Sequence, residues 1–283
     1  MYNLSDIKVI KSLLSKYGFN FVKSLGQNFI VNDELCPKIV KEGVMGDNLG
    51  IIEIGPGLGV LTNELAKKVR KVVAVEIDSR LVPILSDTLS EFKNIKVINE
   101  DFMKKDINEL IINEFKDMNV GICANLPYYI TSPILMKVLE SKADIKFVVA
   151  MVQKETAERI CAEPGTRECG AISLAVRYYS KPKILFDVSR DNFIPIPNVD
   201  SSVIKLDMDK KDLLDESEEK NFFKIVKCAF LKRRKTLVNA LSGNFLITKT
   251  EIEQIFNELK IPLKSRAEEL KFNDFIELSK KMR

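Results

Sequence analysis

The sequence predicts an α/β protein with an open, mostly parallel sheet of seven strands, followed by a small all-α C-terminal domain. Apolar segments of strand length alternate with helical patterns from residue 51 to residue 152. This alternation is typical of a parallel sheet that helices cover on both faces. Beyond residue 220 only helical patterns occur, and residues 207–220 form a charged, linker-like stretch without aromatic side chains. We therefore expect one domain over residues 1–207 and a second, helical domain over residues 208–283.

Two helices are expected before the sheet begins. Ser5 can cap the first, whose apolar residues recur at helical spacing and which ends at Gly18. The second begins at Asn32-Asp33 and ends near Gly43. The seven expected strands are residues 51–54, 72–77, 95–99, 120–124, 147–152, 184–188 and 203–206. The last two are expected to form an antiparallel hairpin at one edge of the sheet. The helices between strands are residues 60–68, about 81–89, and a segment that follows Ser132-Pro133.

The composition excludes several kinds of chemistry. The chain has no histidine, so it cannot use a Ser-His-Asp triad, a histidine general base or a histidine-ligated metal. Its five cysteines are scattered without a Cys-x-x-Cys pair, which argues against a zinc site or a disulfide framework, and we expect no metal. No apolar run is long enough to span a bilayer, and residues 1–6 lack the pattern of a signal peptide. A cytoplasmic protein without membrane contact is therefore expected.

A glycine-dense turn, Gly55-Pro56-Gly57-Leu58-Gly59, follows the first expected strand. Glycines at such a turn let the backbone approach a nucleoside cofactor without Cβ atoms in the way. The dinucleotide pattern Gly-x-Gly-x-x-Gly is absent, because the sixth position is Val60 counted from Gly55 and Thr62 counted from Gly57. The turn therefore argues against a dehydrogenase and favours the looser Gly-x-Gly-x-Gly of methyltransferases.

Four residues, Gly55, Glu76, Asp101 and Asn125, lie at or just after expected strand ends. Ligands of open α/β sheets bind outside the carboxyl ends of the strands, so these residues should converge on one crevice. A carboxylate at position 76 offers paired acceptors to two ribose hydroxyls, as it also would in a dehydrogenase. Asp101 can accept from an adenine amino group, with Phe102 beside the ring. The alternative for Asp101 is an ordinary helix cap.

The segment Asn125-Leu126-Pro127-Tyr128 suits recognition of the exocyclic amine of a flat base. The Asn125 side-chain carbonyl and the Leu126 backbone carbonyl can accept both N6 hydrogens of adenine and free the nitrogen lone pair. Pro127 stiffens this backbone, and Tyr128 offers a stacking face to a base removed from its helix. Phe193 can supply the opposing face. Core packing is the alternative for both aromatic residues. Transfer of a methyl group to this amine requires in-line orientation of the reacting groups and no strong base, which fits a chain without histidine.

The C-terminal part is basic. Residues 221–283 contain 14 Lys/Arg against 7 Asp/Glu, a net charge of +7, while the whole chain carries +4. A single helix over residues 222–241 would place Arg233 in its apolar stripe, so we expect a break near residues 231–234. Lys232, Arg233, Arg234 and Lys235 would then project toward RNA phosphates. The alternative is a solvated basic corner.

Together these motifs resemble the ribosomal RNA adenine N6,N6-dimethyltransferases, in particular the KsgA type that acts on small-subunit rRNA. The resemblance runs from residue 27 to about residue 241. It rests on Gly26-Gln27-Asn28-Phe29, Glu53 to Gly59, Glu76-Ile77-Asp78, Asp101-Phe102, Asn125 to Tyr128, and the proline-rich run from Phe193 to Ser201. It implies a class I, Rossmann-like methyltransferase domain that uses S-adenosyl-L-methionine. The implied cofactor contacts are Asn28, Ile30, Gly55, Glu76, Asp101 and Asn125, and we add Gln27, Gly57, Gly59, Ile77 and Phe102. Residues 24–30 are expected to close over the methionine end.

The resemblance also implies a substrate. It is the pair of adjacent adenosines in the 3'-terminal hairpin of 16S rRNA, which a monomer would dimethylate within the immature small subunit. A large-subunit rRNA methyltransferase of the macrolide-resistance type shares most N-terminal motifs. The proline-rich run and the segment at residues 233–237 favour the small-subunit type. A ribosome-assembly factor whose methylation is secondary is the alternative from another class.

Overall fold

The structure, a computed structural model, describes residues 2–22, 26–209 and 213–282. The chain forms two compact units, Met1–Ala157 with Pro182–Met208, and Glu158–Lys181 with Asp209–Arg283. The chain enters the second unit for the last time between Met208 and Asp209, one residue beyond the boundary expected between residues 207 and 208. The segment Glu158–Lys181, however, groups with the C-terminal helices. Residues 210–212 of the expected linker lie outside the described part of the chain.

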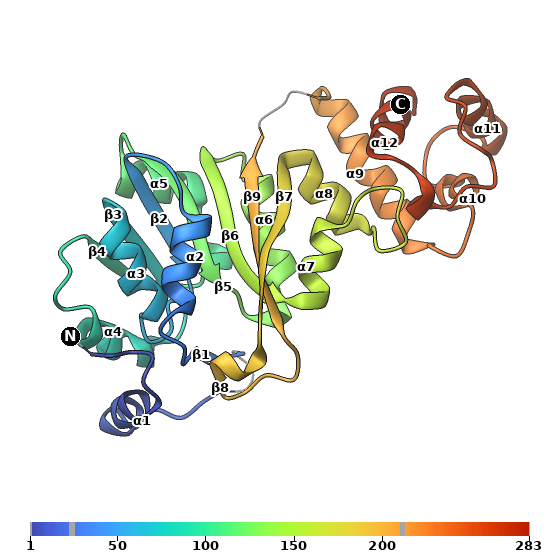
Figure 1. Cartoon of the computed structure of the whole chain (residues 1–283). Coiled ribbons are helices and arrows are strands. Elements are labelled where there is room, and N and C mark those ends of the chain that lie inside the picture. The colour runs from blue at the N-terminus through green and yellow to red at the C-terminus, as the bar shows by residue number, and fades with distance from the viewer. Residues whose placement is uncertain (1, 23–25, 210–212, 283) are drawn as a thin grey trace. The chain divides into compact units, whose positions relative to one another are not determined.

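The first unit is built on a seven-stranded sheet in the order β4-β3-β2-β5-β6-β9-β7 (Figure 1). The strands are β2 (Leu49–Ile54), β3 (Lys71–Glu76), β4 (Ile95–Asn99), β5 (Asn119–Asn125), β6 (Ile145–Gln153), β7 (Ser180–Val188) and β9 (Ser201–Met208). The five strands from β4 to β6 are parallel to one another, and β9 runs antiparallel to β6. The predicted mostly parallel sheet is therefore confirmed, and β7 and β9 are neighbours at one edge.

Helices cover both faces of this sheet (Figure 1). They are α2 (Leu35–Gly43), α3 (Val60–Lys68), α4 (Val82–Thr88), α5 (Ile107–Phe115) and α6 (Thr131–Glu140). Helix α1 (Ile7–Lys16) lies beyond the strand ends, and its Ile10 and Leu14 share a buried core with α4. Apolar residues of α2 and α3 share a buried core with β2 and β6. Every residue of β2 is buried, as expected for a strand that is covered on both sides.

Several local features differ from the sequence-based expectation. The first helix is capped by Asp6, whose carboxylate accepts the Lys8 N–H at 2.7 Å, and not by Ser5. The second helix begins at Leu35, because the Asn32 side chain instead accepts the Glu34 N–H at 2.8 Å in the turn before it. Helix α5 and a two-stranded antiparallel sheet of β1 (Phe29–Ile30) and β8 (Phe193–Ile194) were not predicted.

The second unit consists of helices around its own apolar core. They are α8 (Ala171–Tyr179), α9 (Glu216–Leu231), α10 (Leu237–Leu241), α11 (Lys249–Glu258) and α12 (Phe272–Lys281), with α7 (Lys154–Cys161) crossing from one unit to the other. The Tyr178 ring stacks on Phe222 with the centroids 4.9 Å apart. The predicted helix break is confirmed, since α9 ends at Leu231 and α10 begins at Leu237. Among the helices described, none is both long and apolar enough to traverse a membrane.

Candidate active site

A pocket lies at the carboxyl ends of β2, β3 and β5, where the sequence predicted a crevice. The predicted residues that line it are Gln27, Asn28, Ile30, Gly55, Gly57, Glu76, Ile77, Asn125, Leu126, Pro127 and Tyr128. Lining residues that were not predicted include Glu53, Leu81 and Tyr129. Of the segment expected to close over the cofactor, Ser24 and Leu25 lie outside the described residues.

The glycine turn after β2 leaves room for a ligand at its first position. Gly55 has a φ of +69°, and a Cβ built on it would meet no atom within 4 Å. Gly57 has a φ of +59°, which only glycine adopts without strain. Gly59 is different, because a Cβ there would lie 3.0 Å from the Leu89 side chain. The third glycine therefore allows α3 to begin close to α4, and it does not line the pocket.

Glu76 ends β3 with a buried carboxylate that is only 4% exposed. Its oxygens accept the Asp78 N–H at 2.8 Å and the Gly57 N–H at 3.4 Å, which leaves each oxygen with capacity for a second donor. Burial raises the pKa of Glu76, and the backbone donors act against that shift. The neighbouring Ile77 is 54% exposed and offers an apolar surface at the pocket. This set of groups fits a nucleoside, with the carboxylate on the ribose and Ile77 beside the base.

Glu76→Ala should weaken binding of S-adenosyl-L-methionine by about 1.5–3 kcal/mol, the usual loss for hydrogen bonds to a charged group. Titration calorimetry measures this directly. Glu100→Ala is a matched control, because that carboxylate follows the neighbouring strand, pairs with Lys105 at 2.8 Å and does not line the pocket. Equal cofactor affinity in the two variants would rule out the ribose contact.

The segment from Asn125 to Tyr128 is fixed at several points. The Asn125 Nδ2 group donates to the Asn28 backbone carbonyl at 3.4 Å, so its side-chain oxygen faces away from that carbonyl. The Leu126 N–H donates to the Met151 carbonyl at 3.1 Å. The Tyr128 hydroxyl lies 2.7 Å from Ser201 Oγ, and its half-buried ring lines the pocket. A planar base with an exocyclic amine can therefore meet acceptors and an aromatic face together.

Besides Gly59, three predicted residues do not line this pocket. Asp101 caps a 3-10 turn by accepting the Met103 N–H at 2.9 Å, and Phe102 is buried in that turn. Phe193 is 1% exposed and packs in the core that also contains Ile30. The alternatives of a cap and of core packing thus describe Asp101 and Phe193. Their predicted contacts with cofactor or base, and that of Phe102, stay predictions.

Sequence reasoning missed Glu53, a carboxylic acid inside an otherwise apolar strand. It is 1% exposed, lines the pocket, and its Oε2 has no hydrogen-bond partner among the described residues. Burial raises its pKa to about 8, the nearby Thr62 side chain acts against that rise, and the charge of Glu76 adds to it. The signal was present in the sequence, since a charged residue between Ile52 and Ile54 is rarely buried without a purpose.

Glu53 should make stability depend on pH. With its pKa raised from 4.5 to about 8, the folded chain retains a proton that the unfolded chain loses, so the free energy of unfolding falls as pH rises through this window. Glu53→Gln removes this titration. The free energy of unfolding of this variant, minus that of the native protein, should therefore increase by up to about 1.4 kcal/mol per pH unit as the pH rises from 4.5 to about 8. Urea unfolding at pH 5 and pH 8 measures the difference, and a pH-independent difference would contradict the assignment.

The open parallel sheet, the glycine turn, the buried carboxylate at the end of β3 and the Asn-Leu-Pro-Tyr segment define a class I, Rossmann-like methyltransferase that uses S-adenosyl-L-methionine. The family "Ribosomal RNA adenine dimethylase" matches residues 18–283. The "Ribosomal RNA small subunit methyltransferase A" proteins of Bacillus mycoides and Bacillus cereus are each 45% identical over 273 residues, which cover 95% of this chain and 94% of theirs. The chain therefore belongs to the ribosomal RNA adenine dimethylase family.

Two solved structures share the fold. A dimethyladenosine transferase from Plasmodium falciparum superposes with a TM-score of 0.74 at 24% identity, over 88% of this chain and 95% of that one. The 23S rRNA methyltransferase ErmE superposes with a TM-score of 0.71 at 23% identity, over 90% of this chain and 99% of that one. Both agree with the fold, and at this identity neither distinguishes between substrates.

Proposed function

We propose that this enzyme dimethylates the N6 amines of two adjacent adenosines in the 3'-terminal hairpin of 16S rRNA during small-subunit biogenesis. The observation that supports this most directly is the orientation of Asn125, whose amide nitrogen is bonded to the Asn28 carbonyl while its oxygen is available beside the pocket. The small-subunit methyltransferases that are 45% identical support the choice of ribosomal subunit. An immature small subunit as substrate, a monomeric enzyme and a cytoplasmic location belong to the same proposal.

The chemistry requires orientation of the adenine amine more than it requires a base. S-adenosyl-L-methionine, when bound, supplies a methyl group from a positively charged sulfur. The sulfur is the leaving group and becomes a neutral thioether. Asn125 Oδ1 and the Leu126 carbonyl accept the two N6 hydrogens, which turns the nitrogen lone pair out of conjugation with the ring. Tyr128, fixed through its hydroxyl to Ser201, stacks on the base. Once the amine is in line, proximity accounts for much of the rate.

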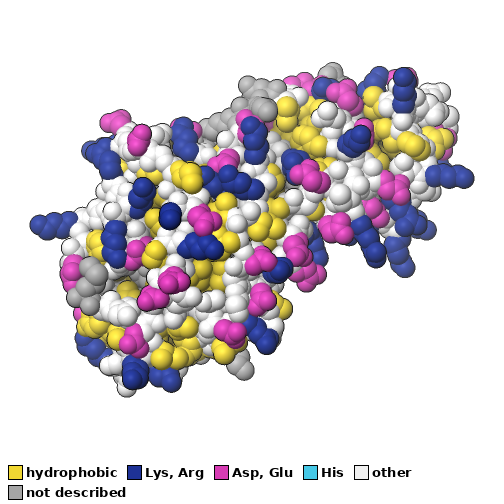
Figure 2. All heavy atoms as spheres, viewed as in Figure 1, with side chains coloured by type: hydrophobic (Ala, Val, Ile, Leu, Met, Phe, Trp, Pro, Cys, Tyr) yellow, Lys and Arg dark blue, Asp and Glu magenta, His cyan; other side chains and the backbone are white. Residues whose placement is uncertain are grey.

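RNA binding is assigned to the second unit. Lys232, Arg233, Arg234 and Lys235 are all exposed in the turn after α9, and Lys and Arg side chains gather over the C-terminal helices in Figure 2. A hollow in this unit is lined by Arg167, Arg233, Arg234, Arg266 and Glu268. Four guanidinium groups around one hollow suit a phosphate backbone, because arginine binds phosphate oxygens in pairs. Arg167 and Arg266 are distant in sequence from the predicted cluster and were not anticipated.

The proposal is tested by supplying the purified enzyme with isotope-labelled cofactor and one of three substrates: immature small subunits, large subunits or naked rRNA. The modified bases are then mapped. We expect dimethylation of adjacent adenosines near the 3' end of 16S rRNA in immature small subunits. Label on 23S rRNA would instead support the macrolide-resistance type.

The assembly-factor alternative requires a separate measurement. A variant that cannot methylate, Asn125→Ala, should still bind immature small subunits if binding has a role of its own. Sedimentation of this variant with such particles tests the alternative without depending on turnover. Normal particle maturation in cells that carry only the variant would make methylation secondary.

A further inference from the structure

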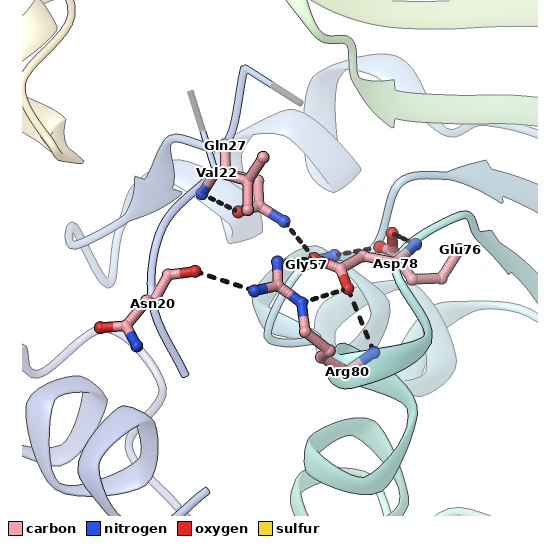
Figure 3. A network of polar contacts seen from close by, with 7 residues as sticks. All are labelled: Asn20, Val22, Gln27, Gly57, Glu76, Asp78 and Arg80. Carbon is pink, nitrogen blue, oxygen red and sulfur yellow. Dashed lines mark hydrogen bonds and ion pairs between the residues drawn. The ribbon is translucent and has the colours of Figure 1, made fainter. Parts of the chain in front are cut away.

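Asp78 is a buried carboxylate, 7% exposed, that follows β3 by two residues and does not line the pocket. Figure 3 shows that it joins two side chains that project from opposite directions. Its Oδ2 accepts from Gln27 Nε2 at 2.8 Å, and its two oxygens accept from Arg80 Nε at 2.8 Å and Nη2 at 2.6 Å. The adjacent guanidinium is the main cause of a lowered pKa of Asp78. The group is therefore a charged, permanent acceptor.

Gln27 and Arg80 connect Asp78 to the chain that precedes the pocket. The Gln27 Oε1 accepts the Val22 N–H at 3.3 Å, so both ends of this amide are engaged inside the protein (Figure 3). Arg80 Nη1 donates to the Asn20 carbonyl at 3.2 Å, and its guanidinium lies 4.7 Å from the Phe19 ring centroid. Gln27 thus acts as a brace, which is a different task from the cofactor contact expected of its side chain.

The braced residue is adjacent to the one that orients Asn125. The Asn28 carbonyl accepts from Asn125 Nδ2 at 3.4 Å, and a carbonyl can only accept. If this carbonyl moves, the Asn125 amide can rotate by half a turn and present its NH₂ group to the adenine amine. Two donors would then face each other, and the amine would lose the acceptor that activates it.

We propose that Asp78 is a positioning residue for methyl transfer, which acts through Gln27 and the Asn28 carbonyl to keep Asn125 Oδ1 directed at the substrate amine. The inference rests on the proposed role of Asn125. It adds a residue that does not itself line the pocket.

Asp78→Asn is the most direct test, because it preserves shape and removes charge. The new NH₂ group would face an Arg80 donor in either orientation, and at the Oδ2 position it would face the Gln27 NH₂ as well. A flipped Gln27 amide would oppose the Val22 N–H. We expect kcat for small-subunit methylation to fall by about 10- to 100-fold, as for a misplaced reacting group, with the KM for RNA unchanged. Should this variant fail to fold, Gln27→Ala removes the same contact from the other side.

A matched control variant and a compensating double variant distinguish a loss of Asn125 orientation from a general loosening of the N-terminal region. Asp87→Asn alters another carboxylate that fastens the N-terminal region, since Asp87 accepts from Lys16 Nζ at 2.7 Å and the Tyr17 hydroxyl at 2.9 Å. It should leave kcat nearly unchanged. Gln27→Glu combined with Asp78→Asn exchanges acceptor and donor across the contact. This double variant should regain part of the lost kcat, because the contact with residue 27 is restored while Arg80 Nη2 still lacks its acceptor. Gln27→Glu alone, with two like charges opposed, should regain none.

Hydrogen exchange without cofactor gives a readout that is independent of turnover. Asp78→Asn should speed exchange of the amides of residues 26–30, and Asp87→Asn should not. The proposal is overturned if Asp78→Asn keeps its kcat within about twofold, if the loss lies in KM, or if Asp87→Asn loses as much. If the native protein did not methylate small subunits, the proposed function would be contradicted. The hydrogen-exchange measurement would then test only whether Asp78 holds residues 26–30 in place.

Discussion

Asn125→Ala is expected to abolish methyl transfer almost completely while leaving the fold intact. In the proposed mechanism the side chain provides an acceptor at the reacting amine, and a hydrogen bond to the Asn28 carbonyl orients it. Removing one preorganised group from a site where charge develops typically costs about 100- to 1000-fold in kcat. The measurement is single-turnover incorporation of labelled methyl groups into immature small subunits. Cofactor affinity should fall modestly at most, because Asn125 also lines the cofactor pocket.

Asn119→Ala is the matched control for this prediction. Asn119 lies at the opposite end of the same strand, where its Nδ2 donates to the Asp47 carbonyl at 3.1 Å, away from the pocket. The two variants remove the same side chain from the same strand. If the Asn125 variant retained turnover near that of the Asn119 variant, activation of N6 by the Asn125 amide would have to be abandoned.

Replacing Arg233 and Arg234 together with alanine should weaken RNA binding and reduce its dependence on salt. Each phosphate contact that is lost should flatten the plot of log K against log salt by about 0.7 to 0.9 units. Arg233 is partly engaged already, since it donates to the Arg167 carbonyl and its Nε lies 3.7 Å from Glu268. We therefore expect Arg234 to contribute the larger share of the loss. Filter binding of a 16S rRNA fragment at several salt concentrations gives both quantities.

The control for charge alone is the pair Lys280 and Lys281 in α12. These exposed cations belong to the same unit and pair with Glu277 and Glu258. Their double alanine variant loses the same formal charge from a different place. Similar salt slopes for the two double variants would mean that the turn after α9 has no special role, and the interpretation as a solvated basic corner would be preferred. Cofactor affinity should stay unchanged in both.

The sheet was predictable because its strands are short apolar runs between clear turn residues. The expected helix at 60–68 and strand at 95–99 coincide with α3 and β4. Other features depend on contacts that no local pattern records. Strands β1 and β8 have two residues each and pair across more than 160 positions of sequence. The helical segment from Glu158 groups with the C-terminal unit through packing between distant parts of the chain.

The position of the site was predictable from residues at strand ends, because Glu76 and Asn125 both line the pocket, as expected, while their roles there stay predictions. The site was less predictable where one side chain serves two purposes equally well. An aspartate after a strand can cap a turn and can bind a ligand; Asp101 caps a turn, and its contact with the cofactor stays a prediction. A phenylalanine both stacks on bases and fills cores, and Phe193 fills the core. Asp78 gave no signal of its own, because its function depends on partners that only the folded chain brings together.

The chain passes between the two units three times, after Ala157, after Lys181 and after Met208. In genetic terms, the part with the arginine hollow is therefore not one contiguous piece of the coding sequence. A gene truncated after Met208 would still encode the stretch with Tyr178, whose stacking partner Phe222 would be gone. Recombination that gives this enzyme a different second unit must then replace two separated gene segments at once, so point substitution is the simpler route to change in that unit.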